Sequence, residues 1–60
     1  MKFRELENIV IADGWIFKNT VGSHQHYIHS LKKGKVTIPF HKGDISKAVV
    51  NSVLKQAGLK

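Results

Sequence analysis

The hydrophobic periodicity of this 60-residue chain changes twice, and this change constrains the fold more than any other feature. Apolar residues recur every three or four positions over residues 2–12 and again over residues 45–57, which is typical of helices with one apolar face. Between these segments the apolar residues alternate, as they do in strands. We expect an α+β fold in the order helix, three strands, helix. The three antiparallel strands form a sheet with both helices on one face.

Glycines and a proline mark the turns and the end of the strand-rich segment. The sequence predicts three strands, at residues 15–20, 24–31 and 35–38. Residues 21–23 form the first turn, and residues 32–34 suit a tight hairpin because Gly34 tolerates a positive φ. Pro39 ends the third strand, since proline has no N–H to donate to the ladder.

Helix signals bound the two amphipathic segments. Gly14 can take the left-handed conformation that terminates the first helix, and Gly58 can do the same for the second. Asp44 or Ser46 is placed to cap the second helix through a side-chain oxygen. No linker or repeat interrupts the chain, so residues 1–60 are expected to form one domain.

Alternation within the second strand assigns its side chains to two faces. Tyr27, His29 and Leu31 point one way, and we expect Tyr27 and Leu31 to face the helices. His24 then faces solvent on the open side of the sheet, while His29 is partly buried or re-aimed by a bulge. Trp15 is expected in the core, because core packing is commoner for such a side chain than stacking on a base.

Positive charge is concentrated in the second part of the chain. Residues 1–16 carry two cations against three anions, whereas residues 17–60 carry eight against one, for a net charge of +6. This asymmetry favours a polyanionic partner, most simply nucleic acid. The candidates for phosphate contacts are the lysines beside the strands, Lys18, Lys35 and Lys42. Lys32 and Lys33 are expected on a solvated rim.

Three absences narrow the function classes. The chain has no cysteine, so a disulfide framework, a thiolate metal site and a thiol nucleophile are excluded. The longest apolar run is Ile9 to Ala12, far short of the roughly 20 residues that span a bilayer. The start of the sequence lacks the basic and apolar pattern of a signal peptide. We therefore expect a cytoplasmic protein that makes no membrane contact.

Histidine is the residue type best suited to carry chemistry here. Four histidines lie close together in the sequence, His24, His26, His29 and His41. Imidazole transfers protons near neutral pH, although most strand histidines are ordinary surface or hydrogen-bonded residues. His24 and His26 on one strand face are also compatible with a metal site. No carboxylate lies near them in the sequence, so we favour acid–base chemistry with no metal.

Four segments carry a family resemblance. They are Asp13-Gly14-Trp15, Gly22-Ser23-His24 with Tyr27 and His29 behind it, Val36-Thr37-Ile38-Pro39-Phe40-His41, and Val53-Leu54-Lys55-Gln56-Ala57-Gly58-Leu59. In order and spacing they resemble the HicA toxin family of HicA–HicB toxin–antitoxin systems, over nearly the whole chain. The chain departs from the family at Asn19, where arginine is common, so one expected phosphate contact is missing.

The resemblance implies a double-stranded-RNA-binding-like fold and an mRNA interferase, an endoribonuclease that uses no metal or other cofactor. It places the catalytic histidine at His24. His29 and His41 also match family positions, and together with Ser23 they are candidates for an auxiliary role. The implied partners are mRNA as the substrate and a HicB-like protein as the antitoxin.

Two other functions stay open on the residues alone. A non-catalytic RNA-binding module of the same fold would grip RNA through its shape and backbone, and would need no histidine. An interaction domain would use its basic face only to bind an acidic partner. RNA integrity after incubation with the protein and a chelator separates the nuclease from the binding module.

Overall fold

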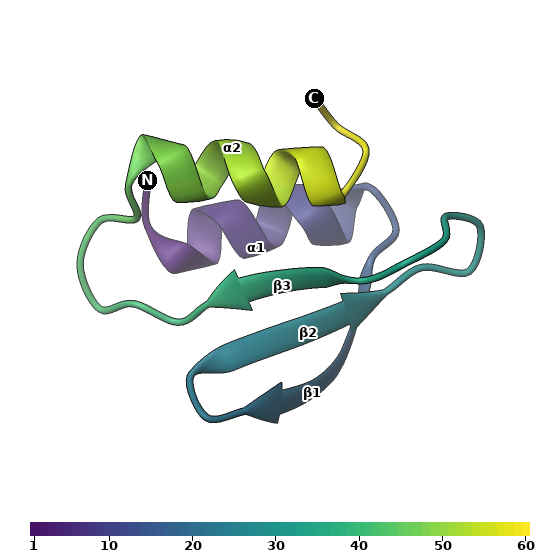
Figure 1. The fold of residues 1–60 in the computed structure, drawn as a ribbon, viewed down its shortest axis with the longest axis horizontal. Coiled ribbons are helices and arrows are strands. Elements are labelled where there is room, and N and C mark those ends of the chain that lie inside the picture. The colour runs from purple at the N-terminus through teal and green to yellow at the C-terminus, as the bar shows by residue number, and fades with distance from the viewer.

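Two helices cover one face of a three-stranded sheet in the computed structural model, which describes all of residues 1–60 (Figure 1). The elements are α1 (Phe3–Ala12), β1 (Ile16–Val21), β2 (His24–Ile28), β3 (Val36–Pro39) and α2 (Lys47–Gln56). The strands are antiparallel in the order β1-β2-β3. This confirms the α+β fold with the order α-β-β-β-α, which is that of a double-stranded-RNA-binding-like domain. Neither helix is long and apolar enough to cross a membrane.

The hydrophobic core lies between the helices and the inner face of the sheet. It consists of nine buried residues, Leu6, Val10, Trp15, Tyr27, Val36, Ile38, Ile45, Val53 and Ala57. Trp15 is only 1% exposed, which confirms its predicted place in the core. Fully burying one large apolar side chain contributes about 1.5–3 kcal/mol. A core this small therefore depends on each of its members.

The ends of the helices are set by local hydrogen bonds and by two glycines with positive φ, Gly14 after α1 and Gly58 after α2. Gly14 follows α1 with a φ of +102°, as predicted for a helix terminator. Ser46 caps α2, since its Oγ accepts the backbone N–H of Val49 at 3.3 Å. Asp44 does not act as the cap, because its carboxylate instead lies 3.3 Å from Lys2 Nζ.

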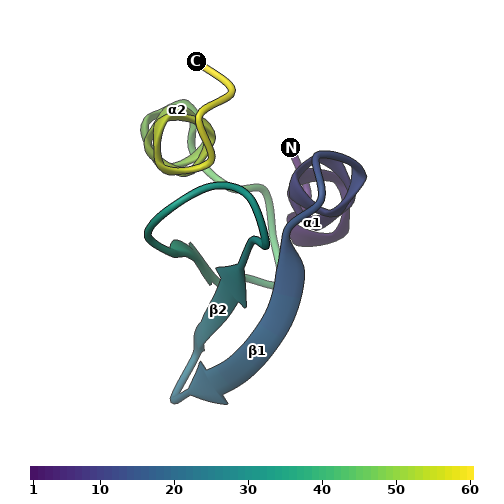
Figure 2. The ribbon, with the colours of Figure 1, turned by 90° about the vertical axis from the view of Figure 1, so that its right-hand side faces the viewer.

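One of the two edge strands of the sheet, β1, contains a β-bulge. Phe17 pairs with Tyr27 and Asn19 pairs with His26, so Lys18 is the extra residue. Every residue of β1 is exposed. Figure 2 shows β1 curving away from the helices toward the turn that joins it to β2. One face of the sheet is therefore covered by helices, and the other is open to solvent.

Two expectations about the second half of the sheet are wrong. β2 ends at Ile28 instead of residue 31, and a loop of residues 29–35 replaces the predicted tight hairpin. Leu31 is 89% exposed and does not face the helices. The cause is His29, whose Nδ1 accepts the backbone N–H groups of Leu31 and Lys32. These N–H groups are thereby diverted from a strand ladder.

Candidate functional site

His24 is the first residue of β2 and directly follows the turn formed by Gly22 and Ser23. Tyr27 is buried against the helices, so the alternating residues His24 and His26 lie on the open face of the sheet. His24 pairs with Val21 of β1 and is itself exposed. Its imidazole is accessible to a large substrate without any rearrangement of the core.

His26 provides a second imidazole on the same face. Two residues along a strand separate positions by about 7 Å, so His24 and His26 are neighbours. The Nδ1 atom of His26 lies 3.0 Å from the Thr37 hydroxyl oxygen on β3. His26 is half-buried, and the Thr37 contact fixes the direction of its ring. The open face thus presents one exposed imidazole beside one that is held in place.

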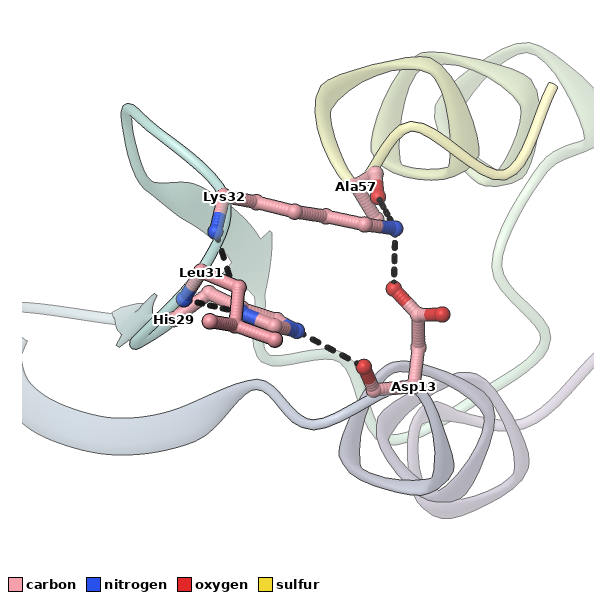
Figure 3. Close-up of polar contacts among 5 residues, drawn as sticks. All are labelled: Asp13, His29, Leu31, Lys32 and Ala57. Atoms are coloured by element: carbon pink, nitrogen blue, oxygen red, sulfur yellow. Dashed lines mark hydrogen bonds and ion pairs between the residues drawn. The ribbon is translucent and has the colours of Figure 1, made fainter.

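His29 lies just beyond the opposite end of β2, within a hydrogen-bonded cluster (Figure 3). Its Nε2 is 2.8 Å from the Asp13 carbonyl oxygen, and its Nδ1 is 2.9 and 3.1 Å from the N–H groups of Leu31 and Lys32. Because a carbonyl oxygen only accepts and an N–H only donates, Nε2 carries the proton and the ring is neutral. The ring also packs edge-on against Trp15, with centroids 5.1 Å apart.

Lys32 completes this cluster, which we call the loop staple: Asp13, His29, Lys32 and Ala57. The Lys32 ammonium donates to the Asp13 carboxylate at 2.5 Å and to the Ala57 carbonyl oxygen at 2.9 Å (Figure 3). The hydrogen bond from Lys32 holds the pKa of the Asp13 carboxyl below its usual value. Lys32 thus joins the ends of both helices to the loop, and the expectation of a solvated rim is wrong for it.

The loop staple and His24 occupy opposite ends of the molecule. Five extended residues correspond to about 16 Å, which is the separation of His24 and His29 along the strand direction. Lys35 precedes β3 and lies at the staple end. The right-hand end of Figure 1 holds the loop of residues 29–35, and the left-hand end holds the β1–β2 turn and the β3–α2 loop. The predicted site residues at the His24 end are Ser23, His41 and Lys42.

A polar groove of about 660 Å³ opens at the His24 end of the molecule. We call it the basic groove. Its lining comes from the start of α1, from β2 and from the segment after β3: Lys2, Phe3, Arg4, Glu7, Gln25, Phe40, His41 and Lys42. Sequence reasoning missed Lys2 and Arg4, because residues 1–16 carry a net negative charge when counted along the chain.

Glu7 is the one carboxylate in the groove lining, and it accepts a hydrogen bond from the Tyr27 hydroxyl. The Tyr27 hydroxyl lies 2.6 Å from Glu7 Oε2 and 3.2 Å from the Gln25 side chain. A hydroxyl has one proton, so Tyr27 donates it to Glu7 at the shorter distance, and Gln25 Oε1 is a second, weaker acceptor. Burial, together with the bond to Glu7, raises the pKa of Tyr27 and keeps its hydroxyl neutral.

Comparison with known families agrees with this architecture. The family model for the HicA toxin of bacterial toxin–antitoxin systems matches residues 3–59. No curated protein matches the sequence. The matched range includes both helices, the whole sheet and the turn before His24. The chain therefore belongs to the HicA toxin family, the toxins of bacterial toxin–antitoxin systems.

Proposed function

We propose that this toxin is an endoribonuclease that cleaves mRNA in the cytoplasm without a metal ion, and that His24 transfers a proton in the reaction. The observation that carries the proposal is the position of His24. Its exposed imidazole opens β2 on the uncovered face of the sheet, in a chain with a net charge of +6. A phosphodiester can reach this face, whereas the opposite face is filled by the helices.

The chemistry requires one base and one acid. The RNA 2′-oxygen attacks the adjacent phosphorus, the bond to the 5′-oxygen breaks, and a 2′,3′-cyclic phosphate and a 5′-hydroxyl result. One group takes the 2′ proton and another protonates the leaving 5′-oxygen. His24 supplies one of these groups, and His26 is our choice for the second because it lies on the same face.

The predicted auxiliary residues, His29, His41 and Ser23, differ in how well they are placed. His41 lies at the His24 end, and its Nδ1 accepts the Gly43 N–H at 3.1 Å, which leaves Nε2 available. Ser23 adjoins His24, and its carbonyl oxygen accepts the Phe40 N–H at 2.7 Å. Both ring nitrogens of His29 are engaged in the loop staple. We therefore assign His29 to the stability of the fold and not to catalysis.

The test is RNA cleavage by purified protein in EDTA. His24→Ala should reduce the cleavage rate by about 10²–10⁴, the usual contribution of one acid or base. His24→Gln, which keeps a hydrogen-bonding side chain that does not titrate, should be equally inactive. Both variants should have the melting temperature of the wild type, because the His24 side chain is exposed. A folded His24→Ala protein that still cleaves RNA would refute the assignment.

Chelation separates acid–base chemistry from metal chemistry. Wild-type cleavage should persist in EDTA, since the proposed reaction uses imidazoles alone. Activity that disappears in EDTA and returns with zinc or manganese would instead make His24 and His26 metal ligands. Intact RNA under every condition would favour the non-catalytic binding module.

Lysine contacts with RNA phosphates predict a steep salt dependence of binding. Lys42 lies at the His24 end, Lys18 is exposed in the bulge of β1, and Lys35 lies at the staple end. Three phosphate contacts would give a slope of about −2 in log affinity against log salt, at about 0.7 per contact on a single strand. Affinity that is independent of salt would remove these lysines from the interface.

A toxin of this kind acts with an antitoxin partner, and we propose that the partner is a HicB-like protein that covers His24. Carboxylates on the antitoxin would meet the lysines and speed encounter. The test is modification of His24 by diethyl pyrocarbonate in the free toxin and in the complex with the neighbouring gene product. Equal reactivity in both would show that inhibition does not work by covering His24.

A further inference from the structure

We propose that the basic groove binds phosphates of the same RNA strand whose scissile bond lies at His24. The inference rests on the proposed function and adds a second contact surface to it. The open face of the sheet would hold the reacting phosphate, and the groove would hold phosphates that flank it around the end of the sheet. The groove is thus assigned an RNA backbone as its ligand.

The charge balance of the groove favours an anion. Arg4 and Lys42 both line the groove, and neither takes part in the two ion pairs of the protein. The one carboxylate of the lining, on Glu7, accepts the Tyr27 hydroxyl at 2.6 Å. The lining therefore has two cations outside any ion pair, against one carboxylate that has an oxygen bound to the Tyr27 hydroxyl. A phosphate with its negative oxygens supplies the missing partner.

Lys2 can join these two cations at little cost. Its ammonium lies 3.3 Å from Asp44, but the two side chains are 59% and 74% exposed. Exposed ion pairs of this kind contribute about 0–1 kcal/mol. A phosphate in the groove can therefore take the place of Asp44 on Lys2.

The groove lies next to the turn that precedes His24. Gln25, which lines the groove, is the residue after His24, and its side chain lies on the opposite face of β2. The Phe40 N–H donates to the Ser23 carbonyl oxygen at 2.7 Å, which fixes the groove wall to the turn. The N-terminus, the β1–β2 turn and the β3–α2 loop gather at the same end of Figure 1. A single strand of RNA can follow this end from one surface to the other.

The lining distinguishes RNA from a protein segment as the occupant. Only Phe3 and Phe40 are apolar, and their rings already pack on each other edge to face at 5.2 Å. A protein partner usually needs an apolar pocket for an aromatic or aliphatic anchor. The groove offers cations and the Gln25 amide instead, which suits a phosphate backbone.

The experiment measures RNA binding with cleavage disabled. His24→Ala protein is titrated with a short fluorescein-labelled single-stranded RNA, by anisotropy, at several potassium chloride concentrations. Adding R4A and K42A should weaken binding at low salt and reduce the salt slope by about 1.4, at about 0.7 for each lost phosphate contact. The matched control adds K33A and K55A, which remove two exposed cations outside the groove. The control should leave the slope unchanged.

The outcomes separate this proposal from the proposed nuclease. An unchanged slope for R4A/K42A in a folded protein overturns the groove proposal, even if the wild type cleaves RNA. An unchanged slope combined with weaker antitoxin binding also overturns it, and assigns the groove to the protein partner. A reduced slope supports the groove, even if the wild type fails to cleave RNA in EDTA and the nuclease proposal falls.

Discussion

Gly14 occupies a position where a β-carbon does not fit. Its φ is +102°, and an ideal Cβ would lie 2.7 Å from Nε2 and 3.3 Å from Cε1 of His29. Gly14→Ala therefore perturbs the protein twice. The backbone takes up a conformation that L-residues avoid, and the His29 ring is pushed away from its hydrogen-bond partners. Only the second effect depends on the loop staple.

The two costs can be estimated separately. A non-glycine residue in the left-handed region costs about 1–2 kcal/mol. The displaced His29 ring loses three hydrogen bonds, at about 0.5–1.5 kcal/mol each. The sum is roughly 2.5–6.5 kcal/mol, against a total stability of roughly 3–9 kcal/mol for a chain of this length. Gly14→Ala should therefore remove most of the stability.

Gly34→Ala is the matched control. Gly34 has a φ of +82° and nothing within 4 Å of an ideal Cβ, so this variant should lose only the backbone cost. Urea denaturation followed by the fluorescence of Trp15, the only tryptophan, measures both. In a His29→Ala background, Gly14→Ala should cost no more than Gly34→Ala. Equal losses for the two glycine variants in the wild-type background would refute the packing of His29 against Gly14.

Four further variants test other contacts. Tyr27→Phe removes the donor to Glu7 and should lower stability by about 1–3 kcal/mol, which a lower melting temperature would show; Glu7→Gln keeps an acceptor and should lose less. The lowered pKa of Asp13 means that its bond to Lys32 contributes stability above the usual carboxyl pKa and loses it as pH falls through the lowered value. Asp13→Asn should flatten this acid side of the stability profile, and an unchanged profile would contradict the pairing. Leu31→Ser should not change the melting temperature, because Leu31 is 89% exposed.

The fold was predictable wherever one face of an element is buried. In β3, Val36 and Ile38 are buried and alternate with half-buried positions. Ile45, Val53 and Ala57 are buried at helical spacing, so the buried positions follow the period of the sequence. The loop of residues 29–35 was not predictable from period, because a side chain decides it. The His29 ring accepts two backbone N–H groups that a strand would use for its ladder. The alternation of apolar residues does not show that a side chain will take these hydrogen bonds.

Part of the candidate site was predictable from the sequence, and part was not. The turn before His24 and the face on which it lies follow from local pattern. The basic groove does not, because Arg4 and Lys42 are far apart in the sequence and meet only through tertiary packing. One contact that brings the two segments together is the Ile45 N–H, which donates to the Met1 carbonyl oxygen at 2.7 Å. A charge count along the chain assigns Arg4 to the acidic first part and Lys42 to the basic second part, although the fold places both in one groove.

The strand order β1-β2-β3 has a consequence for how the protein folds. Each strand pairs only with its neighbour in sequence, across a two-residue turn or the loop of residues 29–35. Short loops cost less entropy to close than long ones, and folds rich in local contacts fold fast. We expect the hairpin that carries His24 to form early in folding. The basic groove needs the first residues of α1 to reach the β3–α2 loop, so it is completed last.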